Sequence, residues 1–241
     1  MLLSLAFLFG LPPMVLPPPV LPLPSQPDAG VTDAGAPDTP AAPAPEVKPT
    51  TCHDTGTCFV RVVFNARVDA KSVESAVAQL RAADAAGAQH VLLEINSLGG
   101  EVEAGFQLAK TVEDSRAHVV CLVDGAAESM GFYILQSCSE RVMSKRSVLM
   151  THQVRLGEIK DSQTTLEELH NYYADIRATS RAFGEHVSRR MNMPYDAYNR
   201  HVAGNLDWYM DWKAALKNRA VDDVIDDVKI FRADVAARVT E

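Results

Sequence analysis

Prolines divide this chain into two unlike parts. Thirteen of the fourteen prolines lie between residues 12 and 49, and the remaining one is Pro194. A segment dominated by Pro, Ala, Asp and Thr buries too little apolar surface to offset the conformational entropy that folding removes. Residues 24–51 are therefore predicted to be a semi-extended, disordered linker. Residues 52–241 are predicted to form a single folded domain of ordinary size.

The first ten residues, MLLSLAFLFG, form a short apolar run. The run is too short to span a bilayer as a helix, and Pro12 and Pro13 would end a helix there. Residues 1–23 are therefore expected to be a signal-like leader that exports the protein to the periplasm or beyond the cell. No Lys or Arg precedes the run and no small-x-small cleavage site follows it closely, so a misplaced start codon on a cytoplasmic protein is the alternative.

The four cysteines are compatible with export. Cys52 and Cys58 flank a glycine-containing turn before the first expected strand, and an oxidising compartment would allow them to pair. Cys121 falls in an apolar strand and Cys138 in an expected helix, where buried free thiols are common. No CxxC pair or Cys/His cluster has metal-ligand spacing, so neither a structural zinc nor another cofactor is expected.

The formal net charge of the chain is −8. No basic stripe is present to neutralise phosphates, so a nucleic-acid partner is not expected. The same charge argues against binding to anionic membrane surfaces, and it leaves the class of polar substrate open.

Beyond the linker, short β-branched runs alternate with amphipathic segments. This alternation favours an α/β fold with a mainly parallel sheet, whose strands are apolar throughout because both faces are covered. Strands are expected at residues 59–64, 91–95, 118–123 and 148–150, and helices at 72–86, 101–114, 129–137, 165–191, shortly after Pro194, and at 212–218. The sequence TLEE at residues 165–168 has the spacing of a capping box, which predicts the start of the longest helix.

Ser129 is the first residue that suggests chemistry. It lies in GAAESMG, residues 125–131, at a strand-to-helix junction. A nucleophile benefits from that position, because the turn exposes the hydroxyl and the helix N-terminal amides lie near a developing oxyanion. Ala127 stands where a GxSxG elbow has its first glycine. The alternative is that Ser129 only caps the helix, as serine commonly does.

Two more features are ambiguous when each is taken alone. Gly99 and Gly100 follow a buried strand, where a glycine pair permits either a plain turn or a close approach to a ligand. His152 lies at the end of an apolar strand, where a histidine is either a structural hydrogen-bonding residue or a base.

The order of these features along the chain resembles the proteolytic subunit of the Clp protease (ClpP). That family carries an Ile-Asn-Ser-Pro-Gly-Gly turn, an Ala-Ala-Ser-Met-Gly nucleophile motif and a Met-x-His-Gln motif. This chain has INSLGG at 95–100, SMG at 129–131 and MTHQ at 150–153, in the same order and at similar separations. The resemblance covers residues 58–228 and implies an acidic third residue downstream, which Asp207 in DWYM matches.

The resemblance implies a ClpP/crotonase-like fold, a repeated β-β-α spiral with a mainly parallel sheet and a long handle-type helix. It implies a serine peptidase domain over residues 52–241, with Ser129 as the nucleophile, His152 as the general base and Asp207 orienting the imidazole. The backbone amides of Gly100 and Met130 would form the oxyanion hole. The substrate would be a peptide or an unfolded protein, and the family's assembly makes a homo-oligomer possible.

Three departures from the family pattern bear on function. Leu98 replaces the turn proline, and Glu128 replaces the alanine before the nucleophile. The Glu128 carboxylate either raises the pKa of His152, repels acidic substrates, or points to solvent, and we expect the last. The span from His152 to Asp207 is longer than in the family, with the excess at residues 156–162. No segment resembles the one that docks an ATP-driven unfoldase, so activity is expected to be independent of ATP.

Three alternatives share this fold. The signal peptide peptidase A family uses a Ser-Lys dyad, for which Lys110 is the nearest candidate base. A catalytically inactive scaffold would bind peptides in the same cleft, although it would have no need of Ser, His and Asp together. A crotonase-type acyl-CoA enzyme is the third, and nothing in the sequence resembles a CoA site.

Overall fold

The computed structural model describes residues 59–155 and 165–237 of the chain. The predicted leader, the predicted linker, Cys52, Cys58 and the extra residues 156–162 lie outside these ranges. All five predicted site residues lie within them.

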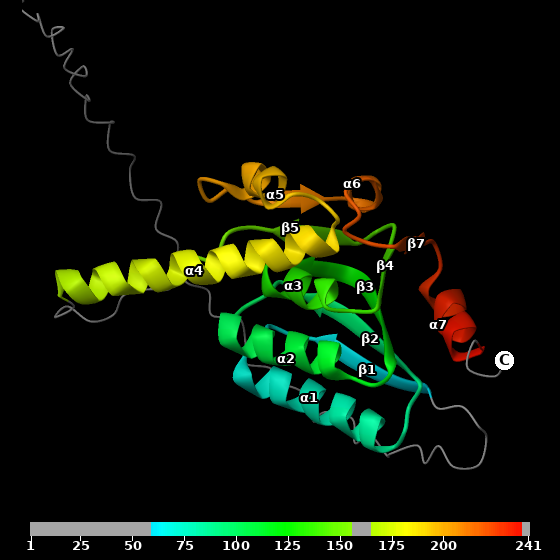
Figure 1. Cartoon of the computed structure of the whole chain (residues 1–241). Coiled ribbons are helices and arrows are strands. Elements are labelled where there is room, and N and C mark those ends of the chain that lie inside the picture. Colours follow the sequence, from blue (N-terminus) through cyan, green and yellow to red (C-terminus); the bar gives the residue numbers. More distant parts are fainter. Residues whose placement is uncertain (1–58, 156–164, 238–241) are drawn as a thin grey trace, which may run out of the picture. The chain divides into compact units, whose positions relative to one another are not determined.

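A seven-stranded sheet forms the centre of the domain (Figure 1). Its main path runs in the order β1-β2-β3-β4-β7 with every neighbouring pair parallel. The strands are β1 (Phe59–Asn65), β2 (His90–Ser97), β3 (His118–Glu128), β4 (Glu140–Ser144), β5 (Val148–Thr151), β6 (Trp208–Met210) and β7 (Asp223–Ile225). The predicted α/β class with a mainly parallel sheet is confirmed, and the topology agrees with a ClpP/crotonase fold.

Helices cover both faces of the sheet. They are α1 (Ala70–Ala85), α2 (Val102–Asp114), α3 (Met130–Gln136), α4 (Leu166–Arg190), α5 (Tyr195–Val202), α6 (Trp212–Lys217) and α7 (Val228–Ala237). The larger core packs α1, α2 and α3 against one set of alternating strand residues, such as Leu93 and Cys121. A second cluster packs Phe231 of α7 against the opposite set, such as Leu92 and Leu122. Burial on both faces explains why these strands are continuous apolar runs.

The sequence patterns predict the long elements but not β4, β6, β7 or α7. The two shortest of these strands, β6 and β7, have three residues each. Three residues carry no readable alternation, so their pairing depends on neighbours that come from elsewhere in the chain.

Strand β3 extends past the predicted end at Val123 and changes partners along its length. Its first half pairs with β4, and residues 126–128 pair with β5 instead. Gly125, which has a φ of +129°, stands between the two halves. This change of direction brings the end of β3 alongside β5, and the chain enters α3 directly afterwards.

Helix α4 is the long handle-type helix that the resemblance implies, and it has 25 residues. Thr165 and Glu168 form the predicted capping box, with both reciprocal hydrogen bonds present. Its buried residues lie near its C-terminal end, beginning at Phe183. The N-terminal half extends beyond the sheet in Figure 1, where Leu166 is 85% exposed.

An ion pair joins the C-terminal part of the chain to β4. Arg141, whose side chain is only 6% exposed, binds Asp222 with a closest distance of 2.5 Å. The same guanidinium donates to Gln136 Oε1 and to the backbone carbonyl of Arg190. A buried arginine is tolerated when its donors are satisfied in this way. Asp222 therefore ties the segment before β7 to α3, β4 and the end of α4.

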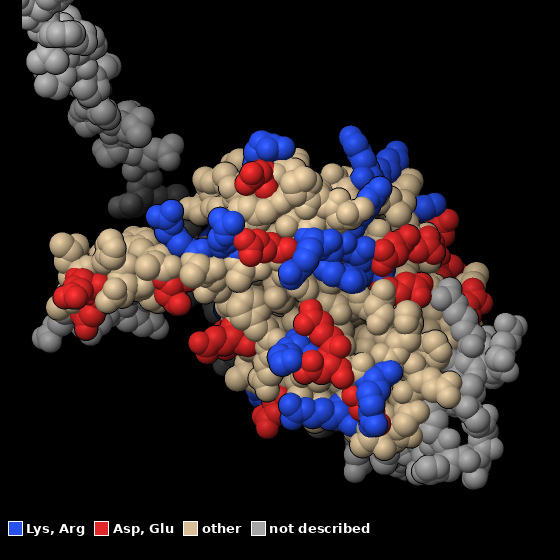
Figure 2. All heavy atoms as spheres, viewed as in Figure 1, with Lys and Arg blue, Asp and Glu red and all other residues tan. Residues whose placement is uncertain are grey.

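Charged side chains of both signs lie next to one another on the face shown in Figure 2. Two ion pairs of the described residues join side chains four residues apart on one helix, Arg181 with Glu185 and Lys110 with Asp114. No helix within the described residues is both long enough and apolar enough to cross a membrane.

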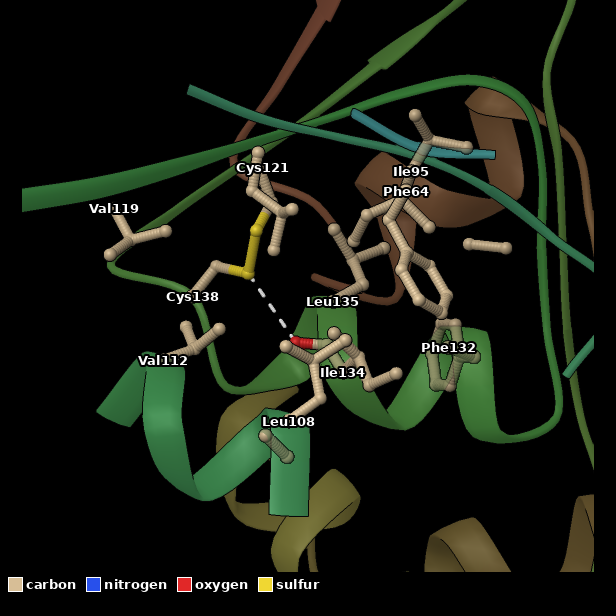
Figure 3. Packing of buried hydrophobic residues seen from close by; sticks show 14 of the residues in the cluster. Phe64, Ile95, Leu108, Val112, Val119, Cys121, Phe132, Ile134, Leu135 and Cys138 are labelled. Atoms are coloured by element: carbon tan, nitrogen blue, oxygen red, sulfur yellow. Dashed lines mark hydrogen bonds between the residues drawn. A yellow bond between two sulfur atoms is a disulfide. The ribbon is translucent and has the colours of Figure 1, made fainter. Parts of the chain in front are cut away.

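The prediction that Cys121 and Cys138 are free thiols is wrong, because they form a disulfide (Figure 3). Cys138 lies in the turn after α3 rather than in the helix, and this turn returns beneath β3. The two Cα atoms are 5.9 Å apart, within the usual range for a disulfide. The dashed line in Figure 3 joins Cys138 Sγ to the Ile134 carbonyl oxygen, 3.3 Å away. An oxidised sulfur has no proton to donate, so this approach is a packing contact.

Removing this disulfide is expected to lower the free energy of unfolding by about 3 kcal/mol, the value for a closed loop of this size. The variant Cys52→Ser/Cys58→Ser leaves Cys121 and Cys138 as the only cysteines. Urea unfolding of this variant with and without a reductant measures the effect. Equal midpoints, with two free thiols titrated in the reduced sample, would contradict the expectation.

Candidate active site

Ser129 occupies a strained turn between β3 and α3. Its φ is +52° and its ψ is −117°, a region that costs a residue with a side chain about 1–3 kcal/mol. Its amide donates to the carbonyl of Met150 on β5 at 2.8 Å, and its carbonyl accepts the amide of Tyr133 at 3.1 Å. These bonds hold the turn on both sides, so the strain is supported by the sheet and by the first turn of the helix.

The alternative that Ser129 only caps the helix does not fit this geometry. A capping residue has extended backbone and accepts an amide hydrogen bond from the first turn. Asp69, Thr165 and Asp211 do this at the starts of α1, α4 and α6. Ser129 has positive φ, and its hydroxyl makes no capping bond. The Ser129 hydroxyl therefore remains available for another role.

Gly99 and Gly100 bring a second piece of backbone to Ser129. A Cβ on Gly99, whose φ is +89°, would lie 2.7 Å from the Ser129 Cβ. A Cβ on Gly100, whose φ is +152°, would lie 2.1 Å from the carbonyl oxygen of Val68. Val68 forms hydrogen bonds with Gly99 and Glu101 on either side of Gly100. The close approach, rather than a plain turn, explains why both positions are glycine.

Two backbone amides near Ser129 have no hydrogen-bond partner within residues 59–155 and 165–237. The Gly100 amide takes part in no hydrogen bond with another described residue. Met130 is the first residue of α3, and an amide at that position has no partner within its helix. Both amides could therefore donate hydrogen bonds to an oxyanion, which is what an oxyanion hole requires.

A pocket of about 110 Å³ opens beside Ser129. Its lining residues are Gly100, Val102, Ser129, Met130, His152, Val154, Arg155 and Phe183. Four of the five predicted site residues therefore line one pocket, and Asp207 is the exception.

His152 follows directly after the end of β5. The preceding residue, Thr151, is fully buried, and its hydroxyl lies 2.8 Å from the Tyr198 hydroxyl on α5. Burial raises the pKa of Tyr198 to about 12, so this phenol stays protonated. The His152 Nδ1 lies 2.5 Å from the carbonyl oxygen of Gln153. The Thr151–Tyr198 contact anchors the strand end that carries the imidazole.

Asp207 lies opposite His152 in the strand register. The antiparallel ladder of β5 and β6 pairs Met150 with Tyr209 and Thr151 with Trp208, so its next step opposes His152 and Asp207. No hydrogen bond nevertheless joins Asp207 to the imidazole that it is predicted to orient. Asp207 Oδ1 instead binds the guanidinium of Arg155.

Glu128 does not point freely into solvent as expected from the sequence. Its side chain is partly buried, and burial raises its pKa above the usual range. The negative charge of Asp207 raises that pKa further, while His152 acts in the opposite direction. Glu128 therefore interacts electrostatically with both groups.

Lys110 is poorly placed to be the base of a Ser-Lys dyad. Its side chain is 73% exposed on α2 and binds Asp114. This hydrogen bond raises the pKa of Lys110, whereas a lysine base needs a lowered one. Lys110 is also absent from the residues that line the pocket at Ser129.

Sequence reasoning missed Arg155 and Tyr198. Neither belongs to a motif, and each forms a side-chain contact with a partner about fifty residues away in the chain: Arg155 with Asp207, and Tyr198 with Thr151. Only the pairing of β5 with β6 and the packing of α5 bring these partners together. No group of three His, Cys, Asp or Glu side chains suited to a metal ion occurs in the part of the chain that the structure describes.

Comparison with known proteins identifies the family of this chain. The family model of the Clp protease matches residues 59–228. An ATP-dependent Clp protease proteolytic subunit of Deinococcus radiodurans is 28% identical over 173 residues, which cover 70% of this chain and 82% of that protein. The ATP-dependent Clp protease proteolytic subunit 1 of Gloeobacter violaceus is 26% identical over 169 residues, covering 68% and 83% respectively. The chain thus belongs to the Clp protease family of serine peptidases.

Proposed function

We propose that this protein is a serine endopeptidase that uses Ser129, His152 and Asp207 as its triad. The proposal rests on the conformation of Ser129. This residue has a positive φ, and backbone hydrogen bonds hold it on both sides. Its hydroxyl makes no capping hydrogen bond, and Ser129 lines the same pocket as His152. Strain of this kind persists where the surrounding structure supports it, and it concentrates at functional sites.

In the proposed mechanism, Ser129 Oγ attacks the carbonyl carbon of the scissile peptide bond and His152 accepts the hydroxyl proton. The carbonyl oxygen becomes an oxyanion and takes hydrogen bonds from the amides of Gly100 and Met130. As the C–N bond breaks, His152 gives the proton to the leaving amine. Water then attacks the acyl-serine with His152 again as the base, which releases the acid and restores Ser129.

Asp207 must leave Arg155 to orient the imidazole. Arg155 and Asp207 are 46% and 33% exposed, and an ion pair of that exposure contributes only about 0–1 kcal/mol. A modest rearrangement is therefore sufficient to release the carboxylate toward His152, which it already opposes in the strand register.

Self-association is the second part of the proposal. The protruding half of α4 exposes apolar side chains, among them Leu166 and Tyr173. Exposed apolar surface on a projecting helix suits contact with a second copy. The family relationship supports both a peptide substrate and an oligomer.

Export is the third part, and the Cys121–Cys138 disulfide supports it. Disulfides persist in oxidising compartments, whereas cytosolic thiols are kept reduced. The apolar leader is consistent with that route. An exported peptidase would act without an ATP-driven partner, because nucleotide is scarce outside the cytoplasm.

The proposal is tested by treating the purified full-length protein with a fluorophosphonate probe and with mixed peptides. We expect covalent labelling at Ser129, located by mass spectrometry, together with cleavage of internal peptide bonds. A Ser137→Ala variant, changed at the other end of α3, is the control and should label normally. If the folded protein neither labels nor cleaves, the alternative of a peptide-binding scaffold is favoured.

A further inference from the structure

Glu128 is the residue of this site that the catalytic mechanism above does not use. It is the last residue of β3 and directly precedes Ser129. Among the described residues it has no hydrogen bond or ion pair of its own. A partly buried carboxylate without a partner is unfavourable, so its presence calls for an explanation.

Strand register places Glu128 on the same face of the sheet as His152 and Asp207. The β3–β5 ladder pairs Glu128 with Met150, and the β5–β6 ladder pairs Met150 with Tyr209. Directly paired residues point to the same face, and so do residues two positions apart on one strand. His152 is two positions after Met150, and Asp207 is two positions before Tyr209. In the sheet, the strand end that carries His152 thus lies between the two segments that carry these carboxylates.

The two carboxylates differ in their surroundings. Asp207, from the segment before β6, is paired with Arg155, from the segment after β5. That cation offsets the negative charge of Asp207. No Lys or Arg of the described residues pairs with Glu128 in this way, so its charge is not offset by such an ion pair. Consistent with this arrangement, His152 lowers the pKa of Glu128, against the upward effects of burial and of Asp207.

We propose that Glu128 is a positioning residue, a second carboxylate that stabilises the charged form of His152. This inference rests on the proposed triad. A carboxylate beside an imidazole favours the imidazolium that forms when Ser129 attacks. Glu128 supplies this support from the residue adjacent to the nucleophile, including while Arg155 holds Asp207.

The inference predicts a lower pKa for His152 when Glu128 is replaced by glutamine. We expect a decrease of about 0.5 to 1 unit in Glu128→Gln, since one partly screened charge is lost. The pKa is followed by NMR titration of ¹³C-labelled histidines in the full chain, with His152→Gln assigning the resonance. Glu128→Asp keeps the negative charge, so the pKa of His152 in this variant should stay close to its value in the parent protein. An unchanged His152 pKa in Glu128→Gln overturns the inference.

Asp124→Asn is a matched control, because it removes one carboxylate from the same strand. The charge of Asp124 is paired with Arg146, so this variant should leave the His152 pKa in place. An equal shift in both variants would show a general loss of charge and would overturn a specific role for Glu128.

Kinetics provide the second readout. The acid limb of the kcat/KM profile in Glu128→Gln should move to lower pH by the same amount as the NMR pKa. The plateau value of kcat/KM in this variant should fall about tenfold, because the imidazolium of His152 is less stabilised. The decrease in plateau kcat/KM caused by Glu128→Gln should be larger in an Asp207→Asn background, where Glu128 is the remaining member of this pair of carboxylates. Equal falls in the two backgrounds would contradict a shared role.

The two proposals fail in different ways. If hydrolysis does not depend on Ser129, the peptidase mechanism fails whatever the NMR titration shows. If hydrolysis depends on Ser129 and the His152 pKa does not respond to Glu128, only this inference fails. Misfolding is detected by a stability measurement. The fold raises the pKa of Glu128, which means that it disfavours the ionised carboxylate. Glu128→Gln should therefore be at least as stable as the parent at neutral pH.

Discussion

Replacing Ser129 with alanine is expected to lower kcat for peptide hydrolysis by about a millionfold, to the background of binding and oxyanion stabilisation alone. The reason is that, among the residues the structure describes, Ser129 is the only one with a hydroxyl that lines the pocket shared by Gly100, Met130 and His152. KM should change little, because the hydroxyl contributes to the transition state rather than to substrate binding. Initial rates on a fluorogenic peptide, measured with the full-length protein, give both constants.

His152→Ala should cause a loss of similar size, and the double variant should lose little more. Residues that act in one step are strongly non-additive when they are removed together. Lys110→Ala is the control, since that side chain is exposed and paired with Asp114. Full activity in His152→Ala would rule out the histidine-based triad, and inactivity in Lys110→Ala would favour the Ser-Lys dyad instead.

Replacing Gly100 with alanine is expected to lower kcat by about a hundredfold or more, the effect of losing one oxyanion donor. The new Cβ would lie 2.1 Å from the Val68 carbonyl oxygen, and backbone atoms on both sides cannot rotate away. The Gly100 peptide must therefore shift, which would move its amide away from the place proposed for the oxyanion. Affinity for a peptide boronate, which forms a tetrahedral adduct on the serine, should fall in the same proportion.

Gly87→Ala is the matched control for Gly100→Ala. Gly87 also has a left-handed φ, +77°, but a Cβ there would meet nothing within 4 Å. This variant should lose about 1 kcal/mol of stability from backbone strain and retain its kcat. Equal losses of kcat in the two variants would mean that general destabilisation, rather than the oxyanion hole, explains the effect of Gly100→Ala.

The long elements of the fold follow from the sequence because their signals are local. A capping box at Thr165, a helical period through Phe183 and apolar runs in β2 and β3 can each be read within one segment. The candidate site is not readable in this way: its residues are ambiguous one by one, and the motif order shared with the Clp protease family is what singles them out. Ser129, His152 and Gly100 each follow the end of a strand, and parallel strands end along one edge of a sheet.

The parts that could not be predicted depend on contacts between distant segments. Cys121 and Cys138 are paired because the turn after α3 returns under β3, whereas the pattern alone places Cys138 in a helix. Arg155 reaches Asp207 only through the antiparallel pairing of a three-residue strand. The burial of Glu128 likewise follows from the change of partners along β3, which no local periodicity encodes.

The Cys121–Cys138 bridge has a consequence for the durability of the enzyme. It closes a covalent ring that contains the end of β3, Ser129 and the whole of α3, across a sequence separation of 17 residues. A single cut in the backbone of this ring, by another molecule of the peptidase or by a different protease, leaves both fragments attached. Ser129 would then remain tethered to the sheet after nicking.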